Sequence, residues 1–464
     1  MCIIIFIFAN KEKRHTDMLK KTNAWLWVPT LSFASGLPYH AITSASDIMY
    51  MDMGVDNKTI ALCTSLLLIP WTIKPLWSPF VEMISTRRKW TLYSQLLLAV
   101  CFTAIAMAVN SESFFFLTLA AFMIGAFVSS THDIALDGFY ILALTQEKQS
   151  FFSGIRNTFY RIAIVFSSGF LVILAARLSS WLGMLGEYAT ELELTSFANT
   201  LEHLSVIFKQ KPYAWSATFA VTATIMAILY IYHNRILPKP EKDESHTPSN
   251  IYGFFNNFIE IIATYFRKPG IWATLLFLLL FRFPEAQLGK IGKLFLMDSI
   301  EAGGLGLDKG DIGFINGVVG IIGLIIGGIA GGICISRKGL KYWLWPMVIA
   351  ISLPDAVYVY MSMAIPSDLY TIGSCVFIEQ LGYGFGFTAY TLYMIYFAQG
   401  KYPTAHFAIS TAFMSLGMML PGMISGYIQE WIGYENFFIW VMACTAVTFA
   451  VSALIKIDPN FGKK

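Results

Sequence analysis

The stretch RILPKPEKDESHTPSN, residues 235–250, is a polar, proline-containing run in the middle of an otherwise apolar chain. Across the 464 residues, 56% are hydrophobic and 13% are charged, whereas a soluble domain carries about 25% charged residues. A soluble core of this size has no room for so much apolar surface. The composition excludes a cytosolic enzyme, a secreted disulfide scaffold and a disordered chain, and it predicts a polytopic membrane protein. The net charge of +3 gives no indication of nucleic-acid binding.

Apolar windows of about 20 residues predict membrane-spanning helices on both sides of this run. Twelve windows qualify, and they cover residues 24–50, 58–82, 90–109, 114–144, 153–180, 214–234, 270–297, 311–335, 341–363, 368–398, 404–429 and 436–456. They lack the ten-residue alternation of outer-membrane strands. The predicted fold class is therefore an all-α membrane protein in which six spans precede the polar run and six follow it.

The basic residues predict the orientation of these spans. Of the Lys and Arg residues in the loops and termini, 21 fall on one side and four on the other. The positive-inside rule places the richer side, with both termini, in the cytoplasm. The connection at 181–213 is then a long outer loop, for which we have no functional account beyond a lid.

Four segments follow from this reading. They are a cytoplasmic N-terminal segment (1–23), a six-helix bundle (24–234), a cytoplasmic linker (235–268) and a second six-helix bundle (269–464). The linker ends in IYGFFNNFIEIIATYF (251–266), which reads as an amphipathic helix at the membrane surface. Residues 1–17 show no cleavage site of a signal peptide, and they are either an extension from an upstream start codon or a short interfacial anchor. This six-plus-six organisation is that of major facilitator transporters.

Short repeats within the chain agree with a duplicated bundle. KPLWSPFVEMISTRRKW (74–90) and GGICISRKGLKYW (331–343) each place a basic cluster and an aromatic residue between two spans. In the span before the second cluster, Gly323, Gly327 and Gly331 lie on one helix face and predict close approach of another helix.

A few charged residues fall inside the predicted spans. A charge at the bilayer centre costs at least about 2.5–3.5 kcal/mol, so these residues are expected to pair or to line a wet cavity. From the rise of a helix, Asp137 and Asp133 lie about 10 Å and 16 Å from the cytoplasmic edge, and Arg161 lies about 13 Å deep. Pairing of Arg161 with one or both aspartates is therefore expected.

The second half has a matching set at mid-depth. Arg282 lies about 17 Å into its span, with Glu285 three residues later on the same face. Glu379 reaches a similar depth from the outer side. The full set of candidate residues for substrate binding or proton coupling is His40, Lys74, His132, Asp133, Asp137, Arg161, Arg282, Glu285, Glu379 and Gln380. Glu82, Arg87 and Arg88 are expected in a gating loop.

The alternative for each charged pair is a structural ion pair between helices, and for His132 a local polar network. We expect no metal, cofactor or catalytic group, because the six cysteines show no metal-ligand spacing and His132 and Asp133 point about 100° apart on a helix.

Three strings resemble a known family. FASGLP (33–38), KPLWSP (74–79) and THDIALDGF (131–139) resemble the AmpG-type muropeptide permeases and their acetyl-CoA transporter relatives. LLFLLLFRFPEAQLGKIGKLFLMD (275–298) looks like the same family's seventh span. The chain departs from the family at His132, Glu82, Arg282 and Glu285, where relatives tend to have Gln, Asp, Lys and Asp.

The resemblance implies a proton-coupled importer of anhydro-muropeptides in the bacterial inner membrane, and the residues themselves indicate only a cavity that suits an anionic organic solute. Its expected partners are that solute, protons and the lipid bilayer, and a monomer is expected. The alternatives are transport of another anionic metabolite such as acetyl-CoA or a siderophore, a membrane-embedded acyltransferase, or a non-transporting receptor.

Overall fold

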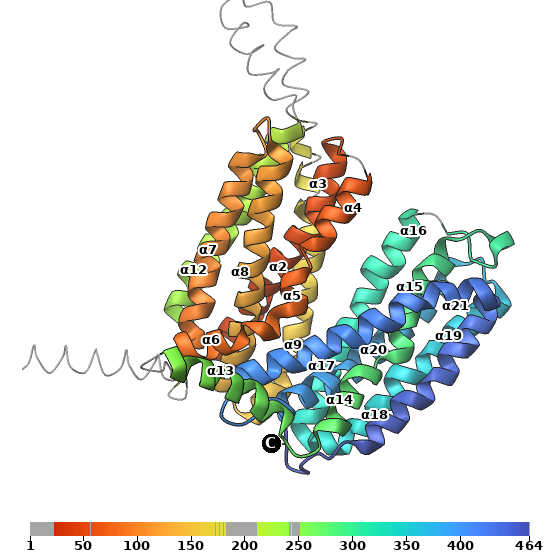
Figure 1. The fold of residues 1–464 in the computed structure, drawn as a ribbon. Helices are drawn as coiled ribbons and strands as arrows, with labels where there is room; N and C mark the ends of the chain where they lie inside the picture. Colours follow the sequence, from red (N-terminus) through yellow and green to blue (C-terminus); the bar gives the residue numbers. More distant parts are fainter. Residues whose placement is uncertain are drawn as a thin grey trace, which may run out of the picture. The chain divides into compact units, whose positions relative to one another are not determined.

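The computed structural model describes residues 23–463, apart from 56, 172, 176, 180, 182–210, 241–242, 244–250 and 308. The described residues form helices and connecting turns, without strands (Figure 1). They fall into two compact units, which we describe separately. The first comprises Met1–Lys74, Ser85–Phe139 and Phe159–Glu244, and the second comprises Pro75–Ile84, Tyr140–Thr158 and Ser245–Lys464. The predicted segment boundaries stay predictions, and most of the long outer connection lies outside the described residues.

The first unit is built from the helices that precede the linker. Their bounds are α2 (Ala24–His40), η1 (Ala41–Ala45), α3 (Ser46–Asp52), α4 (Asn57–Leu66), α5 (Ile69–Ile73), α7 (Arg87–Ala108), most of α8 (Phe114–Ala143), the end of α9 (Gln146–Val165), η3 (Phe166–Phe170) and α12 (Lys211–Ile236). Helices α7 and α12 pack side by side (Figure 1). Buried aromatic residues such as Tyr50, Phe102 and Phe219 fill the core between them and α8.

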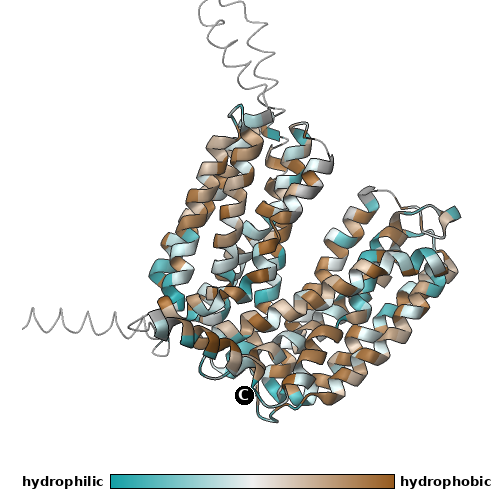
Figure 2. Ribbon diagram, viewed as in Figure 1, coloured by the Kyte–Doolittle hydropathy of each residue, from teal (hydrophilic) through white to brown (hydrophobic). Residues whose placement is uncertain are grey.

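The second unit holds the linker helix, the helices that follow it and two segments from before it. The bounds are η2 (Lys74–Leu76) without Lys74, which belongs to the first unit, α6 (Ser78–Ile84), the end of α8, the first part of α9, α13 (Ile251–Phe266), α14 (Ile271–Leu280), α15 (Phe283–Met297), η4 (Ile300–Ala302), α16 (Lys309–Phe314), η5 (Ile315–Val319), α17 (Gly320–Lys338), α18 (Leu340–Ser352), η6 (Leu353–Asp355), α19 (Ala356–Ala364), α20 (Leu369–Ala398) and α21 (Pro403–Leu454). Apolar residues run along the long helices of both units, and hydrophilic residues gather near several helix ends (Figure 2).

Seven helices in the described part are long and apolar enough to cross a membrane. They are Arg87–Ala108, Phe114–Ala143, Pro212–Ile236, Ile271–Met297, Ile315–Lys338, Leu340–Ala364 and Pro403–Leu454. The last has 52 residues and breaks at Gly433, whose φ of 75° is left-handed, so it covers the two final predicted spans. The number twelve stays a prediction.

Several other predicted spans are interrupted helices. The first span contains Pro29 and Pro38 and passes through the π-turn η1. The second breaks around Pro70 and Pro75, because proline supplies no amide hydrogen for the helical ladder. Within a membrane such breaks persist only where the freed backbone groups are buried or face a cavity.

The glycine face predicted on α17 is confirmed. A Cβ added at Gly323 would lie 2.6 Å from the carbonyl oxygen of Phe377, and one at Gly327 would lie 2.0 Å from that of Leu381. Only glycine permits this distance, so α17 and α20 pack backbone against backbone.

Candidate functional site

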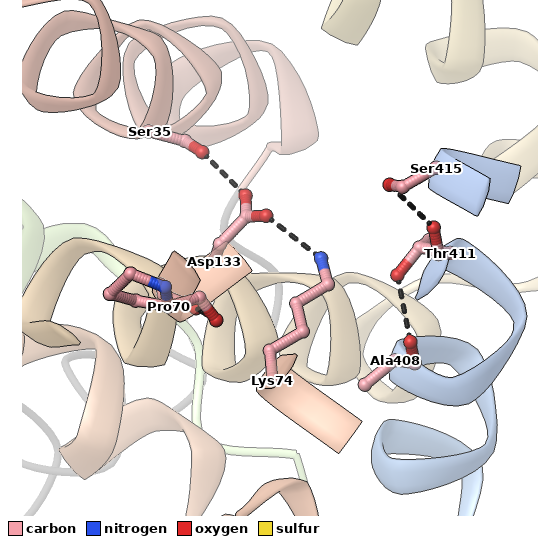
Figure 3. A network of polar contacts seen from close by, with 8 residues as sticks. Ser35, Pro70, Lys74, Asp133, Ala408, Thr411 and Ser415 are labelled. Atoms are coloured by element: carbon pink, nitrogen blue, oxygen red, sulfur yellow. Dashed lines mark hydrogen bonds and ion pairs between the residues drawn. The ribbon is translucent and has the colours of Figure 1, made fainter. Parts of the chain in front are cut away.

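A buried ion pair occupies the first unit where three of its elements meet. Lys74 begins η2, and its Nζ lies 3.2 Å from Oδ2 of Asp133 on α8. The hydroxyl of Ser35 on α2 donates to the other oxygen, Oδ1, over 2.8 Å (Figure 3). The Lys74 side chain is 7% exposed and the Asp133 side chain 22% exposed. We call these three residues the Lys74–Asp133–Ser35 triad.

The break in the second predicted span places Lys74 in this triad. Pro70 and Pro75 interrupt the helix on either side of Thr72, and the carbonyl oxygen of Pro70 accepts a hydrogen bond from Ser130 on α8 over 3.1 Å. The chain thus turns against α8 next to Asp133. Sequence reasoning expected Arg161 to pair with Asp133, with Asp137 or with both, and the structure shows an ion pair of Asp133 with Lys74.

Arg161 lies near a group of aromatic residues, His40 and Tyr160 among them. It acts electrostatically on the ring of His40 and on the hydroxyl of Tyr160. The His40 ring centroid is 4.7 Å from that of Tyr39, which is itself 4.7 Å from Trp71 in an edge-on arrangement. Asp137 is buried on α8, one turn beyond Asp133. This corner of the first unit combines one guanidinium group with aromatic faces.

His132 belongs to a different network. Its Nε2 lies 3.1 Å from Nε2 of Gln95 on α7, and Oε1 of Gln95 lies 3.0 Å from Nδ1 of His233 on α12. Nε2 of His233 then contacts the hydroxyl of Thr30 over 3.0 Å. Both histidines and Gln95 are fully buried. The geometry matches the alternative of a local polar network, and sequence reasoning missed Gln95 and His233.

In the second unit, Arg282 lies at a break between α14 and α15. Its Nε donates to Oε2 of Glu285 over 2.8 Å, and its Nη2 donates to the hydroxyl of Tyr383 on α20 over 2.7 Å. The guanidinium carbon also lies 4.8 Å from the ring centroid of Phe387. A cation over an aromatic face gains electrostatic energy where water is excluded. Sequence reasoning placed Glu285 on the same helix face as Arg282, and the structure joins the two in an ion pair.

Glu379 and Gln380 lie on α20 beside this pair. The side-chain amide of Gln380 donates to Oε2 of Glu379 over 2.9 Å. Glu379 is 5% exposed and is close enough to Glu285 to interact electrostatically with it. The second unit therefore holds an arginine with several buried carboxyl groups.

The residues predicted for the gating loop lie at helix N-termini. Glu82 contacts the N-terminus of α21, and Arg87 and Arg88 form that of α7. Oε2 of Glu82 on α6 accepts a hydrogen bond from the amide of Ala405 over 3.0 Å, in the first turn of α21. A carboxylate there complements the partial positive charge of a helix N-terminus. The amides of Arg87 and Arg88, which begin α7, donate to Asp243 of the linker, and Nη1 of Arg87 lies 3.6 Å from the same carboxylate.

The linker helix α13 has two different faces. Ile261 packs with Met83, Tyr402 and Ala405, whereas Tyr252 is exposed to solvent or lipid. Phe255 and Ile259 share that exposed side. After α13, the Nζ of Lys268 donates to the carbonyl oxygens of Phe397 and Gln399 at the end of α20. Burial lowers the pKa of Lys268 to about 8.

No group of three or more His, Cys, Asp or Glu residues that could hold a metal ion is present in the described part of the chain. The buried polar residues instead form separate ion pairs and hydrogen-bond networks in each unit. This arrangement suits binding of an organic ion and of protons, since each carboxyl group can exchange a cationic partner for a proton.

Known proteins resemble this chain in sequence and in fold. The sequence is 25% identical over 419 residues to the anhydromuropeptide permease of Escherichia coli K12, covering 89% of this chain and 76% of the permease. It is 23% identical to an uncharacterised protein of Haemophilus influenzae, covering 88% of each. The structure superposes on the E. coli fucose:proton symporter FucP with a TM-score of 0.66 at 12% identity, covering 93% of this chain and 98% of FucP.

The sequence profile described as Major Facilitator Superfamily matches residues 30–420. Proteins of this family are multi-pass membrane transporters of small molecules and not enzymes. The chain therefore belongs to the Major Facilitator Superfamily and is a membrane transporter.

Proposed function

We propose that this transporter imports an anionic amino-sugar peptide of the anhydro-muropeptide type, together with protons, across a bacterial inner membrane. The observation that carries the proposal is the Lys74–Asp133–Ser35 triad. Each of the three strings that resemble the muropeptide permeases supplies one of its members, and the structure brings the three side chains into contact. The relative named an anhydromuropeptide permease supports the same substrate class.

The triad provides a way to couple a proton to an anion. Lys74 is buried and requires a negative partner, because an unpaired charge at this depth is costly. When a proton binds Asp133, the carboxyl group becomes neutral and Lys74 can accept a substrate carboxylate instead. When the substrate leaves, Asp133 releases its proton and pairs with Lys74 again. One proton therefore moves with each anionic group.

Neighbouring groups fit the rest of such a substrate. The rings of Tyr39 and Trp71 are suited to the apolar face of a sugar, while Arg161 attracts a second anionic group. In the second unit, Arg282 and Glu285 repeat the same chemistry with a guanidinium group. We propose that the protein works as a monomer with both termini in the cytoplasm.

The experiment is uptake of labelled anhydro-muropeptide into membrane vesicles with an imposed pH gradient. The wild-type protein is expected to accumulate substrate only with the gradient, and Asp133→Asn and Glu285→Gln are expected to lose this accumulation. Glu435→Gln, at an exposed position, is the control. Uptake that ignores the gradient, with normal transport by both variants, contradicts the coupling.

A substrate panel in the same vesicles tests the alternatives. Acetyl-CoA and a ferric siderophore are offered in competition with the labelled muropeptide. Competition by either one, without competition by unlabelled muropeptide, assigns the transporter to another anionic metabolite.

A further inference from the structure

The helix that contains the ninth predicted span breaks at its polar centre. Between α18 and α19, residues Leu353–Asp355 form the short 3₁₀ turn η6, where Pro354 cannot continue the helical ladder. Oδ2 of Asp355 and the hydroxyl of Ser352 are both buried, and neither has a hydrogen-bond partner in the described structure. Asp355 is only 2% exposed. A buried carboxyl oxygen without a partner is costly unless the group is protonated or holds a ligand.

Helix α20 packs directly against this break. A Cβ added at Gly382 would lie 2.1 Å from the carbonyl oxygen of Ala350 and 2.7 Å from Cγ of Pro354. Glu379 lies three residues before Gly382 and therefore shares its helix face. Both Glu379 and Glu285 interact electrostatically with Asp355. The glycine contact thus brings the helix face that carries Glu379, a second buried carboxyl group, against the break that contains Asp355.

The charges around this pair do not balance. Arg282, directly before α15, forms its ion pair with Glu285, and Lys290 and Lys293 on α15 are exposed. The other titratable groups near the pair are Tyr358 on α19 and Cys375 on α20, neither of which can carry a positive charge. Tyr383 on α20 bonds to Arg282. On α21, Cys444 and Tyr434 bond to Gln287 and Asp298 instead.

Two buried carboxyl groups therefore remain without a facing cation among the described residues. Adjacent carboxylates away from water cannot both ionise, so one must carry a proton or a cation must bind.

We propose that Asp355 and Glu379 form a proton-binding pair that holds one proton between two carboxyl groups. A proton is favoured over a metal ion, because no cluster in the described part of the chain has enough ligands to hold a metal. The pair differs from the Lys74–Asp133–Ser35 triad, in which Lys74 already balances the carboxylate. Its role as a carrier of the coupling proton rests on the proposed function, whereas its capacity to hold a proton does not.

Infrared difference spectroscopy of the purified full-length protein tests the bound proton without any substrate. At neutral pH the wild-type protein is expected to show the carbonyl stretch of a protonated carboxylic acid. The band should shift in Asp355→Asn and in Glu379→Gln, and disappear in the double variant, while Glu435→Gln keeps it. A band that is unchanged in the double variant overturns the proposal, and so does a wild-type band that sodium ions abolish at constant pH.

Transport assays then separate proton storage from substrate binding. Exchange of labelled for unlabelled anhydro-muropeptide at equal pH requires no net proton movement. Asp355→Asn is expected to retain exchange and to lose accumulation driven by the pH gradient.

Loss of exchange in Asp355→Asn protein that remains monodisperse assigns the pair to the substrate and overturns its carrier role. If wild-type protein carries no muropeptide but shows the infrared band, the proposed function fails and the proton-binding pair stands.

Discussion

Asp133 shows how a single side chain can depend on partners from distant parts of the chain. Its two oxygens accept from Ser35 and Lys74, which come from two different elements. The charge of Asp133 was conspicuous in the sequence, and its depth was estimated from helix geometry. Its partner was not predictable, because Arg161 had a suitable depth and the turn at Pro75 that delivers Lys74 depends on packing.

The triad predicts a non-additive effect on stability. Lys74→Met and Asp133→Leu should each lower the free energy of unfolding by roughly 3 kcal/mol, since each removes one partner of a largely buried ion pair. The double variant should recover much of this loss, because both charges are gone. Thermal unfolding in detergent measures the effect, and additive losses would show that the two groups do not interact.

The ion pair in the second unit predicts a requirement for arginine. Arg282→Lys keeps the positive charge but loses the planar group that bonds Glu285 and Tyr383 and stacks on Phe387. We expect muropeptide uptake to fall by about tenfold or more, equivalent to about 1.4 kcal/mol. Lys293→Arg, at an exposed position on α15, is the control. Equal activity of both variants contradicts a requirement for the planar guanidinium group of Arg282.

At the scale of elements, glycine determines which helices touch. Gly327→Val should destabilise the protein, because a Cβ there lies 2.0 Å from the Leu381 carbonyl oxygen and α17 must move from α20. The effect should exceed about 2 kcal/mol, the range of overpacked cores. Gly373→Ala on α20 has no atom within 4 Å of its added Cβ and should be neutral or slightly stabilising. Equal unfolding temperatures for both variants would contradict the close packing.

The end of α20 predicts a pH-dependent contribution from Lys268. Lys268→Met leaves the carbonyl oxygens of Phe397 and Gln399 without this donor, at a cost of about 1–3 kcal/mol. The pKa of Lys268 is lowered to about 8 in the folded protein, from 10.5 without burial. Between these values the unfolded chain binds more protons, so the stability of the wild type relative to Lys268→Met should rise with pH.

Chemical unfolding at several pH values between 8 and 10.5 measures this difference. Lys401→Met is the control, because the exposed pair of Lys401 with Glu260 contributes at most about 1 kcal/mol. The hydrogen bond and charge of Lys401 lower the pKa of Glu260, and the hydrogen bonds to Tyr402 and Glu260 raise the pKa of Lys401. The small contribution of this pair is therefore present throughout the pH range between 8 and 10.5. If the difference in unfolding free energy between the wild type and Lys268→Met does not change with pH, the lowered pKa of Lys268 is contradicted.

For the whole molecule, the fold class was easier to predict from the sequence than the contacts between side chains were. The sparse charges and the polar run at 235–250 led to the facilitator fold, which the comparisons confirm. The roles of the candidate residues stay predictions. Asp355 is recognisable in the sequence as an acidic residue within a predicted span. Pro354 beside it indicates that the helix breaks there. The Gln95–His233 contact joins helices far apart in sequence, and no pattern within either helix indicates it.

Segments from before and after the linker pack within one unit, and this packing predicts that the Ala405 amide is protected from hydrogen exchange. Glu82→Ala removes the acceptor for the Ala405 amide at the N-terminus of α21, an interaction of about 0.3–2 kcal/mol. Hydrogen exchange of that amide should accelerate, by a smaller factor in Glu82→Gln. Exchange rates that match the wild type in both variants would show that the contact does not form in solution.

The two-faced helix α13 has a consequence for the choice of lipid. Its exposed side carries Tyr252, Phe255 and Ile259, while its other side packs beside α6 and α21. We predict that acyl chains cover the exposed side, so that the helix lies at the height at which the hydrocarbon layer ends. Bilayers that are too thin or too thick for this height impose hydrophobic mismatch, so turnover in liposomes should peak at one acyl-chain length.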